Sequence, residues 1–83
     1  MSSAPAADSP GRMRKHSLVV AGHSTSISLE SAFWDALRVH ARERGLSVAA
    51  LVAEVDAARG EANLSSALRV RLLRVFQDKA SAR

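Results

Sequence analysis

The segment TSISL at residues 25–29 alternates apolar and polar side chains and stands directly before a helical pattern. Thr25, Ile27 and Leu29 share one face, as in a half-buried strand. The opposite face carries Ser24, Ser26 and Ser28. One short strand cannot form a stable sheet by itself. The chain must therefore pair this strand with a second one of its own or with the same strand of another copy.

A candidate for the second strand lies just upstream, in the β-branched stretch His16–Ala21. Gly22, His23 and Ser24 can turn the chain between the two strands. The upstream strand can pair within its own chain, or it can continue a ribbon between subunits. Both arrangements remain open at the level of the sequence.

Two helices are predicted next, over residues 30–44 and from 48 to about 59. In the first, Phe33, Leu37 and Ala41 recur every four residues, and Trp34 widens this apolar stripe. Gly45 suits a helix C-cap and Ser47 an N-cap, so the connection between the helices is very short. The second helix has an apolar face and is stopped by Gly60. That face consists of Val48, Leu51, Val52 and Val55.

A third helix is predicted from Leu64 to about Asp78, with Asn63 as its N-cap. Its apolar stripe consists of Leu64, Leu68, Leu72, Val75 and Phe76. The preceding elements are joined by short turns, whereas residues 1–12 are rich in Ser, Ala, Pro and Gly without periodicity. We therefore expect a disordered basic arm at 1–14, one domain at 15–78 and a disordered tail at 79–83.

Composition excludes several classes of protein. The chain has 83 residues, which is enough for one small domain, and it has no cysteine. None of its three histidines forms a pair at helical metal-ligand spacing, and no nucleophile elbow or phosphate loop is present. We expect no enzymatic activity, no metal and no cofactor. Because no apolar run approaches the length of a membrane span, we also expect a cytoplasmic protein without a membrane contact.

The net charge of +4 is unevenly distributed. Basic ends surround an acidic middle, which suits nucleic acid or an acidic partner, although solubility alone also explains it. Arg14 and Lys15 belong to the basic N-terminal end, and we expect them to contact phosphate. The third helix carries arginines at 69, 71 and 74, mostly off its apolar stripe, and these form either a solvated face or a basic strip.

Two polar features have both a structural and a functional interpretation. Ser24, Ser26 and Ser28 are either the wet face of an edge strand or a base-reading row, since a β-ribbon fits the DNA major groove. Ser47 either makes a tight helix connection or presents the first N–H groups of the second helix to a phosphate. Phe33 and Trp34 lie on the apolar stripe, so we interpret them as core or dimer-interface residues rather than as a base-stacking pair.

The order of these elements resembles the ribbon-helix-helix superfamily of the Arc and Met repressor type. The resemblance covers about residues 15–76 and depends on the strand, the helix ending at Gly45, Leu46-Ser47 and the second helix. A more specific set of motifs, AGH at 21–23, TSISLE at 25–30, FW at 33–34 and NLSSALR at 63–69, is similar to a bacterial, mostly uncharacterised family of short ribbon-helix-helix proteins.

The resemblance implies a mainly α fold with a short β-ribbon, extended here by a third C-terminal helix and an N-terminal strand. It also implies an intertwined homodimer in which each subunit gives one strand to the ribbon. The residues expected at the dimer interface are Ile27, Leu29, Phe33, Trp34, Leu37, Leu51 and Val55. By the same resemblance, Ser24, Ser26 and Ser28 occupy the positions of the ribbon that bind DNA in the family, and Ser47 occupies a position that contacts phosphate.

Two functions follow from the sequence. The first is a homodimeric, DNA-binding transcriptional regulator, and its selectivity for sequence should be weak because serine pairs with several base edges. The alternative is a protein-interaction adaptor or antitoxin-like module built on the same dimer. In that case the third helix or the N-terminal arm would dock a larger protein.

Overall fold

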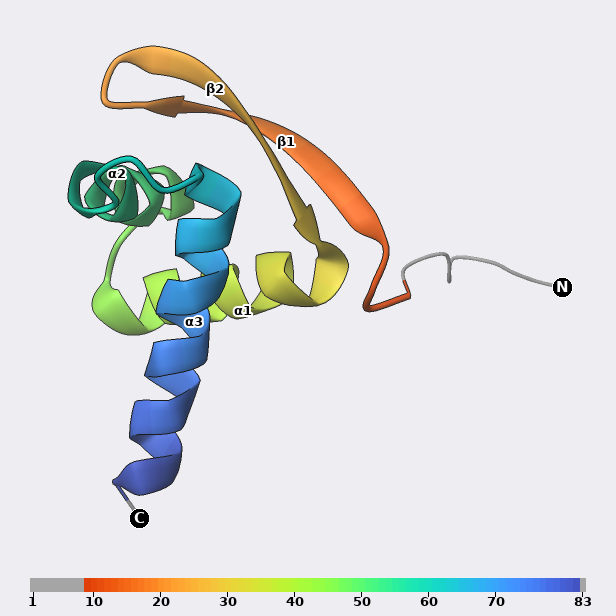
Figure 1. The fold of residues 1–83 in the computed structure, drawn as a ribbon, viewed down its shortest axis with the longest axis vertical. Coiled ribbons are helices and arrows are strands. Elements are labelled where there is room, and N and C mark those ends of the chain that lie inside the picture. Colours follow the sequence, from red (N-terminus) through yellow and green to blue (C-terminus); the bar gives the residue numbers. More distant parts are fainter. Residues whose placement is uncertain (1–8, 83) are drawn as a thin grey trace, which may run out of the picture.

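A computed structural model describes residues 9–82 and shows a β-hairpin followed by three helices (Figure 1). The strands are β1 (Met13–Val20) and β2 (His23–Glu30), and they form a two-stranded antiparallel sheet. The helices are α1 (Ser31–Arg44), α2 (Val48–Ala58) and α3 (Leu64–Ser81). The predicted fold class, a short ribbon followed by three helices, is confirmed.

The ribbon forms within one chain. β1 pairs with β2 along its whole length, from Met13 opposite Glu30 to Val20 opposite His23. Ala21 and Gly22 make the turn with φ values of 52° and 85°. Positive φ at both central residues is what a two-residue type I′ turn requires, and this turn matches the twist of the strands. The upstream strand thus pairs within its own chain, whereas the resemblance implied a ribbon made from two subunits.

Two boundaries differ from the sequence prediction. β1 begins at Met13, so Arg14, which we placed in the arm, lies in a strand. The ladder continues past the strand end, because the Ser31 N–H donates to the Arg12 carbonyl at 2.8 Å. α3 continues to Ser81 instead of ending near Asp78, so part of the predicted tail is helical. Of the predicted arm and tail, residues 1–8 and 83 lie outside the described residues.

The predicted caps are confirmed. Gly45 ends α1 with a φ of 70°, and its N–H donates to carbonyls of the last turn. Ser47 begins α2, and its side chain accepts a hydrogen bond from the Ala50 N–H at 3.0 Å. Asn63 caps α3 in the same way through the Ser66 N–H at 3.2 Å. These local signals place the helix ends where the sequence predicted them.

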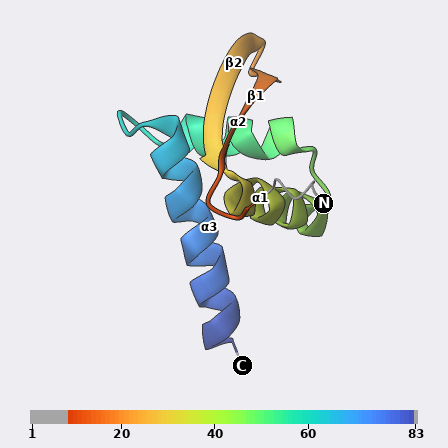
Figure 2. The same ribbon diagram turned by 90° about the vertical axis from the view of Figure 1, so that its right-hand side faces the viewer.

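The inner face of the hairpin packs on the helices, with β1 against α2 and β2 against α1 and α3. Figure 2 shows the hairpin extending away from α1 and α2, and α3 crossing beside them and projecting beyond them. The buried hydrophobic side chains are Val20, Ile27, Leu29, Trp34, Leu37, Ala41, Leu51, Val52, Val55, Leu68 and Leu72. All five elements contribute to this core, so it holds the hairpin at a fixed angle to the helices.

Phe33 and Phe76 both lie on apolar helix stripes of the sequence, yet both are more exposed than those stripes indicate. Trp34 is fully buried, while Phe33 is only partly buried and packs against the edge of the core. Phe76, which we placed on the apolar stripe of α3, is 71% exposed. The reason is that α3 outruns its neighbours, so its C-terminal half has less of the domain to pack against (Figure 1).

Candidate nucleic-acid interface

The outer face of the hairpin carries the serine row. Residues directly opposite each other in an antiparallel pair share a face. The register therefore groups Ser24, Ser26 and Ser28 with their partners on β1, which are Val19, Ser17 and Lys15. Ser28 is partly buried, and the other five residues are exposed. We call these six residues the outer hairpin face.

The opposite face of the hairpin explains why the outer one is left open. Ile27 and Leu29 are 2% and 0% exposed, and Val20 is 4% exposed. Since side chains alternate between the faces of a strand, burying this apolar set against the helices directs the serines toward solvent. The strand prediction from the alternating TSISL segment is confirmed by this burial pattern.

Ser17 was not predicted as a site residue, yet it belongs to the same surface. It lies opposite Ser26, and their Oγ atoms are 3.4 Å apart. The signal was present in the sequence: a two-residue turn at Ala21-Gly22 fixes the register and thereby puts Ser17 beside Ser26. We had left the pairing of the upstream strand open, so this position could not be assigned.

Arg14 and Lys15, which we grouped as phosphate-contacting residues, lie on opposite faces of β1. Lys15 is opposite Ser28 and belongs to the outer hairpin face. Arg14 is opposite Leu29, and its side chain lines a pocket of about 500 Å³ on the helix side of the hairpin. The structure thus brings Lys15 to the serine row and separates Arg14 from it.

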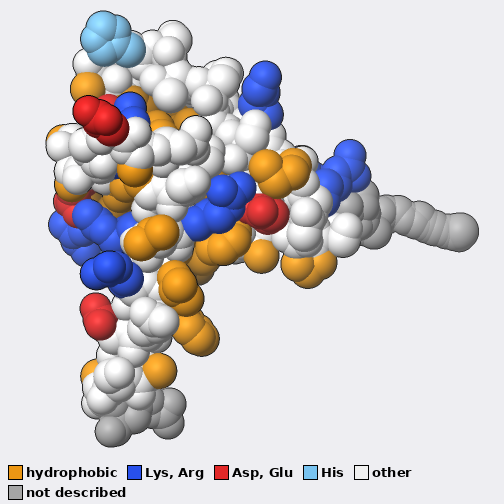
Figure 3. All heavy atoms as spheres, viewed as in Figure 1, with side chains coloured by type: hydrophobic (Ala, Val, Ile, Leu, Met, Phe, Trp, Pro, Cys, Tyr) orange, Lys and Arg blue, Asp and Glu red, His pale blue; other side chains and the backbone are white. Residues whose placement is uncertain are grey.

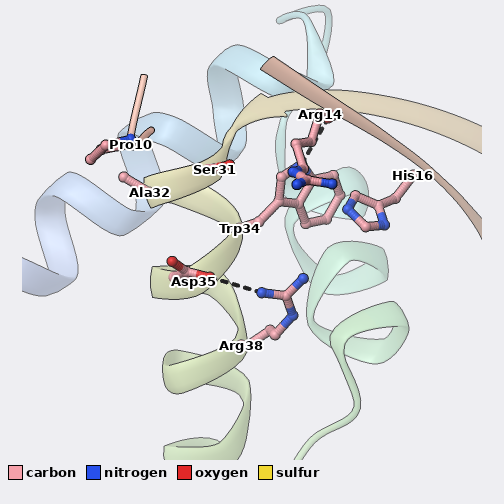
Figure 4. A pocket seen from close by; sticks show the side chains of 8 residues that line it. All are labelled: Pro10, Arg14, His16, Ser31, Ala32, Trp34, Asp35 and Arg38. Carbon is pink, nitrogen blue, oxygen red and sulfur yellow. Dashed lines mark hydrogen bonds and ion pairs between the residues drawn. The ribbon is translucent and has the colours of Figure 1, made fainter. Parts of the chain in front are cut away.

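The pocket beside Arg14 is built around Trp34 (Figure 4). The Trp34 Nε1–H donates to the Arg14 carbonyl at 2.9 Å, and the rings of His16 and Trp34 meet edge to face at 4.4 Å. Arg38, which also lines the pocket, is paired with Asp35 at 2.9 Å. These contacts tie β1 to α1, so we interpret this region as a structural junction.

Ser47 is exposed at the start of α2, and the side-chain cap described above holds it in place. The first N–H groups of a helix have no intrahelical acceptor, so Val48 and Ala49 can offer theirs to an anion. No hydrogen bond or ion pair of residues 9–82 joins Ser47 to the hairpin. The structure therefore keeps Ser47 and the outer hairpin face as separate features of one chain.

The arginines of α3 are mostly engaged in ion pairs. Arg69 binds Glu30 at 2.9 Å, and Arg71 binds Glu54 at the same distance. Glu54 also accepts two hydrogen bonds from Arg44. Hydrogen bonds from Arg44 and then Arg71 lower the pKa of Glu54 to about 2. This pairing favours a solvated, neutralised face over a basic strip at positions 69 and 71.

The residues predicted at a dimer interface are mostly enclosed by one chain. Ile27, Leu29, Trp34, Leu37, Leu51 and Val55 are all buried in the core of the single protomer. Phe33 alone of that set is partly exposed. Buried side chains have little surface left for a partner, so the structure gives these six residues a role in the core of the single protomer.

Other kinds of site find no support in the described part of the chain. Residues 9–82 contain no group of three or more His, Cys, Asp or Glu side chains that could hold a metal ion. Within the same residues, no helix is both long enough and apolar enough to cross a membrane.

A two-stranded antiparallel ribbon with an exposed polar face, followed by short-linked, capped helices, defines the class of fold to which the chain belongs. Comparison with protein families matches residues 13–76 to the ribbon-helix-helix domain, and the chain belongs to this family. Its members are generally DNA-binding regulators or antitoxins, and the fold is non-enzymatic. The resemblance of the sequence to the ribbon-helix-helix superfamily is therefore confirmed.

A solved structure supports the same assignment. The chain is similar to an uncharacterized protein from Bordetella pertussis Tohama I, with a TM-score of 0.76 and 36% sequence identity. The similarity covers 88% of this chain and 62% of that one. A search of curated proteins finds no match.

Proposed function

We propose that this protein is a homodimeric, DNA-binding transcriptional regulator that reads DNA with the outer hairpin face. The observation that carries the proposal is the exposure of Ser17, Ser24 and Ser26 beside Lys15 on a two-stranded ribbon. Two strands about 4.8 Å apart fit a major groove about 12 Å wide. Hydroxyl groups on that face can donate to base edges or accept from them.

The composition of this face sets the expected selectivity. Serine hydroxyls pair with several base edges, and Val19 can contact only apolar groups such as a thymine methyl. Lys15 adds one positive charge per chain, which suits a phosphate at the groove edge. We therefore expect weak discrimination between sequences and binding that depends steeply on salt. In this proposal Ser47 and the α2 N-terminus hold a second phosphate and fix the orientation of the ribbon.

The test is an electrophoretic mobility assay on genomic fragments at two salt concentrations, with a serine variant and a matched control. Ser26→Asp places a negative charge in the centre of the outer hairpin face and should weaken binding at least tenfold. Ser66→Asp makes the same change at an exposed serine in the first turn of α3 and should leave binding unchanged. If the wild-type chain binds no fragment at low salt, the proposal fails.

Lys15→Gln gives a second, quantitative readout. Each phosphate contact contributes about 0.9 to the slope of log binding constant against log salt concentration. A dimer contains two copies of Lys15, so its slope should fall by about 2. An unchanged slope would remove Lys15 from the interface, whereas Ser26→Asp tests the serine row independently.

An adaptor or antitoxin-like role is the second candidate, and one feature favours it. The C-terminal half of α3 exposes the large apolar side chains Leu73 and Phe76. A protein partner could cover them. Copurification of a stoichiometric partner at native expression level would support this role, and a chain that purifies alone would contradict it.

A further inference from the structure

The junction of β1 and α1 contains a polar pocket of about 500 Å³ (Figure 4). We call it the β1–α1 pocket. Its described lining comes from residues 10–38, so the exposed apolar side chains that Figure 3 shows along α3 are not part of it. Small-molecule sites in proteins usually have volumes of about 300–1,000 Å³. The β1–α1 pocket is therefore large enough for a ligand the size of a small metabolite.

Basic side chains converge on this pocket from two elements. Arg14 and His16 line it from β1, and Arg38 lines it from α1. Asp35 is the one acidic residue in the described lining. With histidine counted as neutral, two arginines against one aspartate leave one positive charge. This balance favours an anionic ligand over a neutral or cationic one.

Arg38 has hydrogen-bond donors to offer such a ligand. Its Nη1 donates to Oδ1 of Asp35 at 2.9 Å, and this bond uses only one of the N–H donors of the guanidinium. The side chains of Arg38 and Asp35 are 49% and 74% exposed, so solvent screens the pair. Arg38 can therefore bind an anion while it keeps its contact with Asp35.

Two buried polar atoms of the lining, Ser31 Oγ and His16 Nε2, have no hydrogen-bond partner among residues 9–82. Ser31 is 7% exposed. Leaving such an atom unpaired costs folding free energy, so each instance in a native structure calls for a partner or a functional reason. A small rotation of each side chain brings its polar atom toward a ligand in the pocket. An oxyanion suits both atoms, because it accepts from a hydroxyl and from a protonated ring nitrogen.

The wall of the pocket is held in place by contacts within the chain. Trp34 is 3% exposed, and its Nε1–H donates to the Arg14 carbonyl at 2.9 Å. Its indole ring also meets the His16 ring edge to face, with the centroids 4.4 Å apart. These contacts fix β1 against α1 at the two residues that line the pocket from the strand. Groups on such a preorganised wall lose little conformational freedom when a ligand binds.

We propose that the β1–α1 pocket binds a small molecule through a phosphate group. Arg14 and Arg38 supply the opposite charge, and His16 and Ser31 supply further donors. These groups come from a strand and a helix, so they approach a ligand from different directions. The tetrahedral oxygens of a phosphate accept hydrogen bonds from several directions, whereas a carboxylate accepts them close to one plane. The arrangement therefore fits phosphate better than carboxylate.

The pocket is separate from the outer hairpin face. Along β1, Arg14 and His16 alternate with Lys15 and Ser17, so the two pairs lie on opposite sides of the hairpin. DNA on the outer hairpin face would not reach the pocket. The phosphate group is therefore that of a free small molecule and not that of a DNA backbone. Neither the pocket nor its ligand depends on the proposed function.

The test uses Trp34, the only tryptophan of the chain, as a reporter in the pocket wall. Its fluorescence and the NMR signal of its indole N–H are followed while inorganic phosphate is titrated into the full chain. Sodium chloride keeps the ionic strength constant, and acetate replaces phosphate in a parallel titration. We expect a saturable change with phosphate and an affinity for acetate that is about tenfold weaker or less. Equal affinities for the two anions would overturn the assignment to phosphate.

Two variants test the residues of the site, and a third is their control. Arg38→Gln removes a guanidinium and should weaken phosphate binding about tenfold or more. Arg42→Gln should bind phosphate like the wild type, because Arg42 is exposed one turn further along α1 and does not line the pocket. Ser31→Ala should weaken binding without lowering the melting temperature in phosphate-free buffer, because its Oγ has no partner to lose. A lower melting temperature with unchanged binding would remove Ser31 from the site.

Three results would overturn the inference. The first is the absence of a saturable change in the Trp34 signals with phosphate, and the second is equal phosphate affinity of Arg38→Gln and Arg42→Gln. The third is weaker DNA binding by Arg38→Gln in the mobility assay while free phosphate leaves the Trp34 signals unchanged, which would assign the pocket to the DNA backbone. If phosphate binds as expected but the chain binds no DNA at low salt, the pocket stands and the DNA-binding proposal fails.

Discussion

The turn at Ala21-Gly22 decides whether the ribbon closes within one chain, and it offers a direct test of the fold. Ala21 has a φ of 52°, a left-handed conformation that costs a residue with a Cβ atom about 1–2 kcal/mol. Asparagine tolerates this conformation better, and Asn-Gly is the preferred pair for a type I′ turn. Ala21→Asn should therefore stabilise the protein by roughly 0.5–1 kcal/mol.

Gly22→Ala provides the opposite change at the neighbouring position. Gly22 has a φ of 85°, and a Cβ atom added there would meet no other atom within 4 Å. Its cost is therefore that of the backbone conformation alone, about 1–2 kcal/mol. Gly11→Ala is the matched control, because Gly11 is equally uncrowded and its φ lies outside the left-handed region. The control should be neutral or slightly stabilising.

Urea denaturation at one fixed protein concentration measures these differences, and a thermal melt should show about 4–8 °C per kcal/mol for a domain of this size. The reasoning would be refuted if Ala21→Asn failed to stabilise the protein while Gly22→Ala and Gly11→Ala behaved alike. That result would mean that residues 21 and 22 do not form a left-handed turn. The two strands would then have to pair between subunits.

The core and its ion pairs give three further predictions. Leu29→Ala should cost about 2–5 kcal/mol, because Leu29 is 0% exposed, and a loss below about 1 kcal/mol in urea denaturation would contradict its enclosure. Trp34→Phe removes the hydrogen bond to the β1 backbone and should cost at least about 1 kcal/mol by the same measurement. Glu54 has a folded pKa of about 2 against an ordinary value of 4.5, so its stabilising contribution is complete above pH 4.5 and is lost as pH falls toward 2. Thermal melts across this range should show that loss in the wild-type protein and a smaller one in Glu54→Gln.

The ends of the helices could be predicted from the sequence because their signals are local. Gly45, Ser47 and Asn63 each act on backbone groups within a few residues, and all three cap the predicted helix ends. The exception is the C-terminal end of α3, which runs to Ser81 with no strong stop signal at Asp78. Where a helix end is fixed by a capping residue and the adjacent helical turn, the sequence was sufficient to predict it.

The candidate site was only half predictable. The alternation of TSISL correctly separated the buried Ile27 and Leu29 from the serines. It could not show that Ser17 lies on the same face as the serines or that Arg14 lies on the opposite face, because both positions depend on the register of a second strand. The positions of these two residues follow from pairing across the turn, which is a contact between segments and not a property of either one.

The sequence by itself determined the elements of this protein: a half-buried strand, three capped helices and a family pattern that spans most of the chain. The tertiary structure decided which faces of those elements pack against one another and which remain exposed to solvent. It enclosed Trp34 and exposed Phe76, although both lie on apolar helix stripes, because one faces the hairpin and the other lies where α3 projects from the domain. Periodicity tells which side chains of a helix lie together, whereas burial depends on whether another element reaches them.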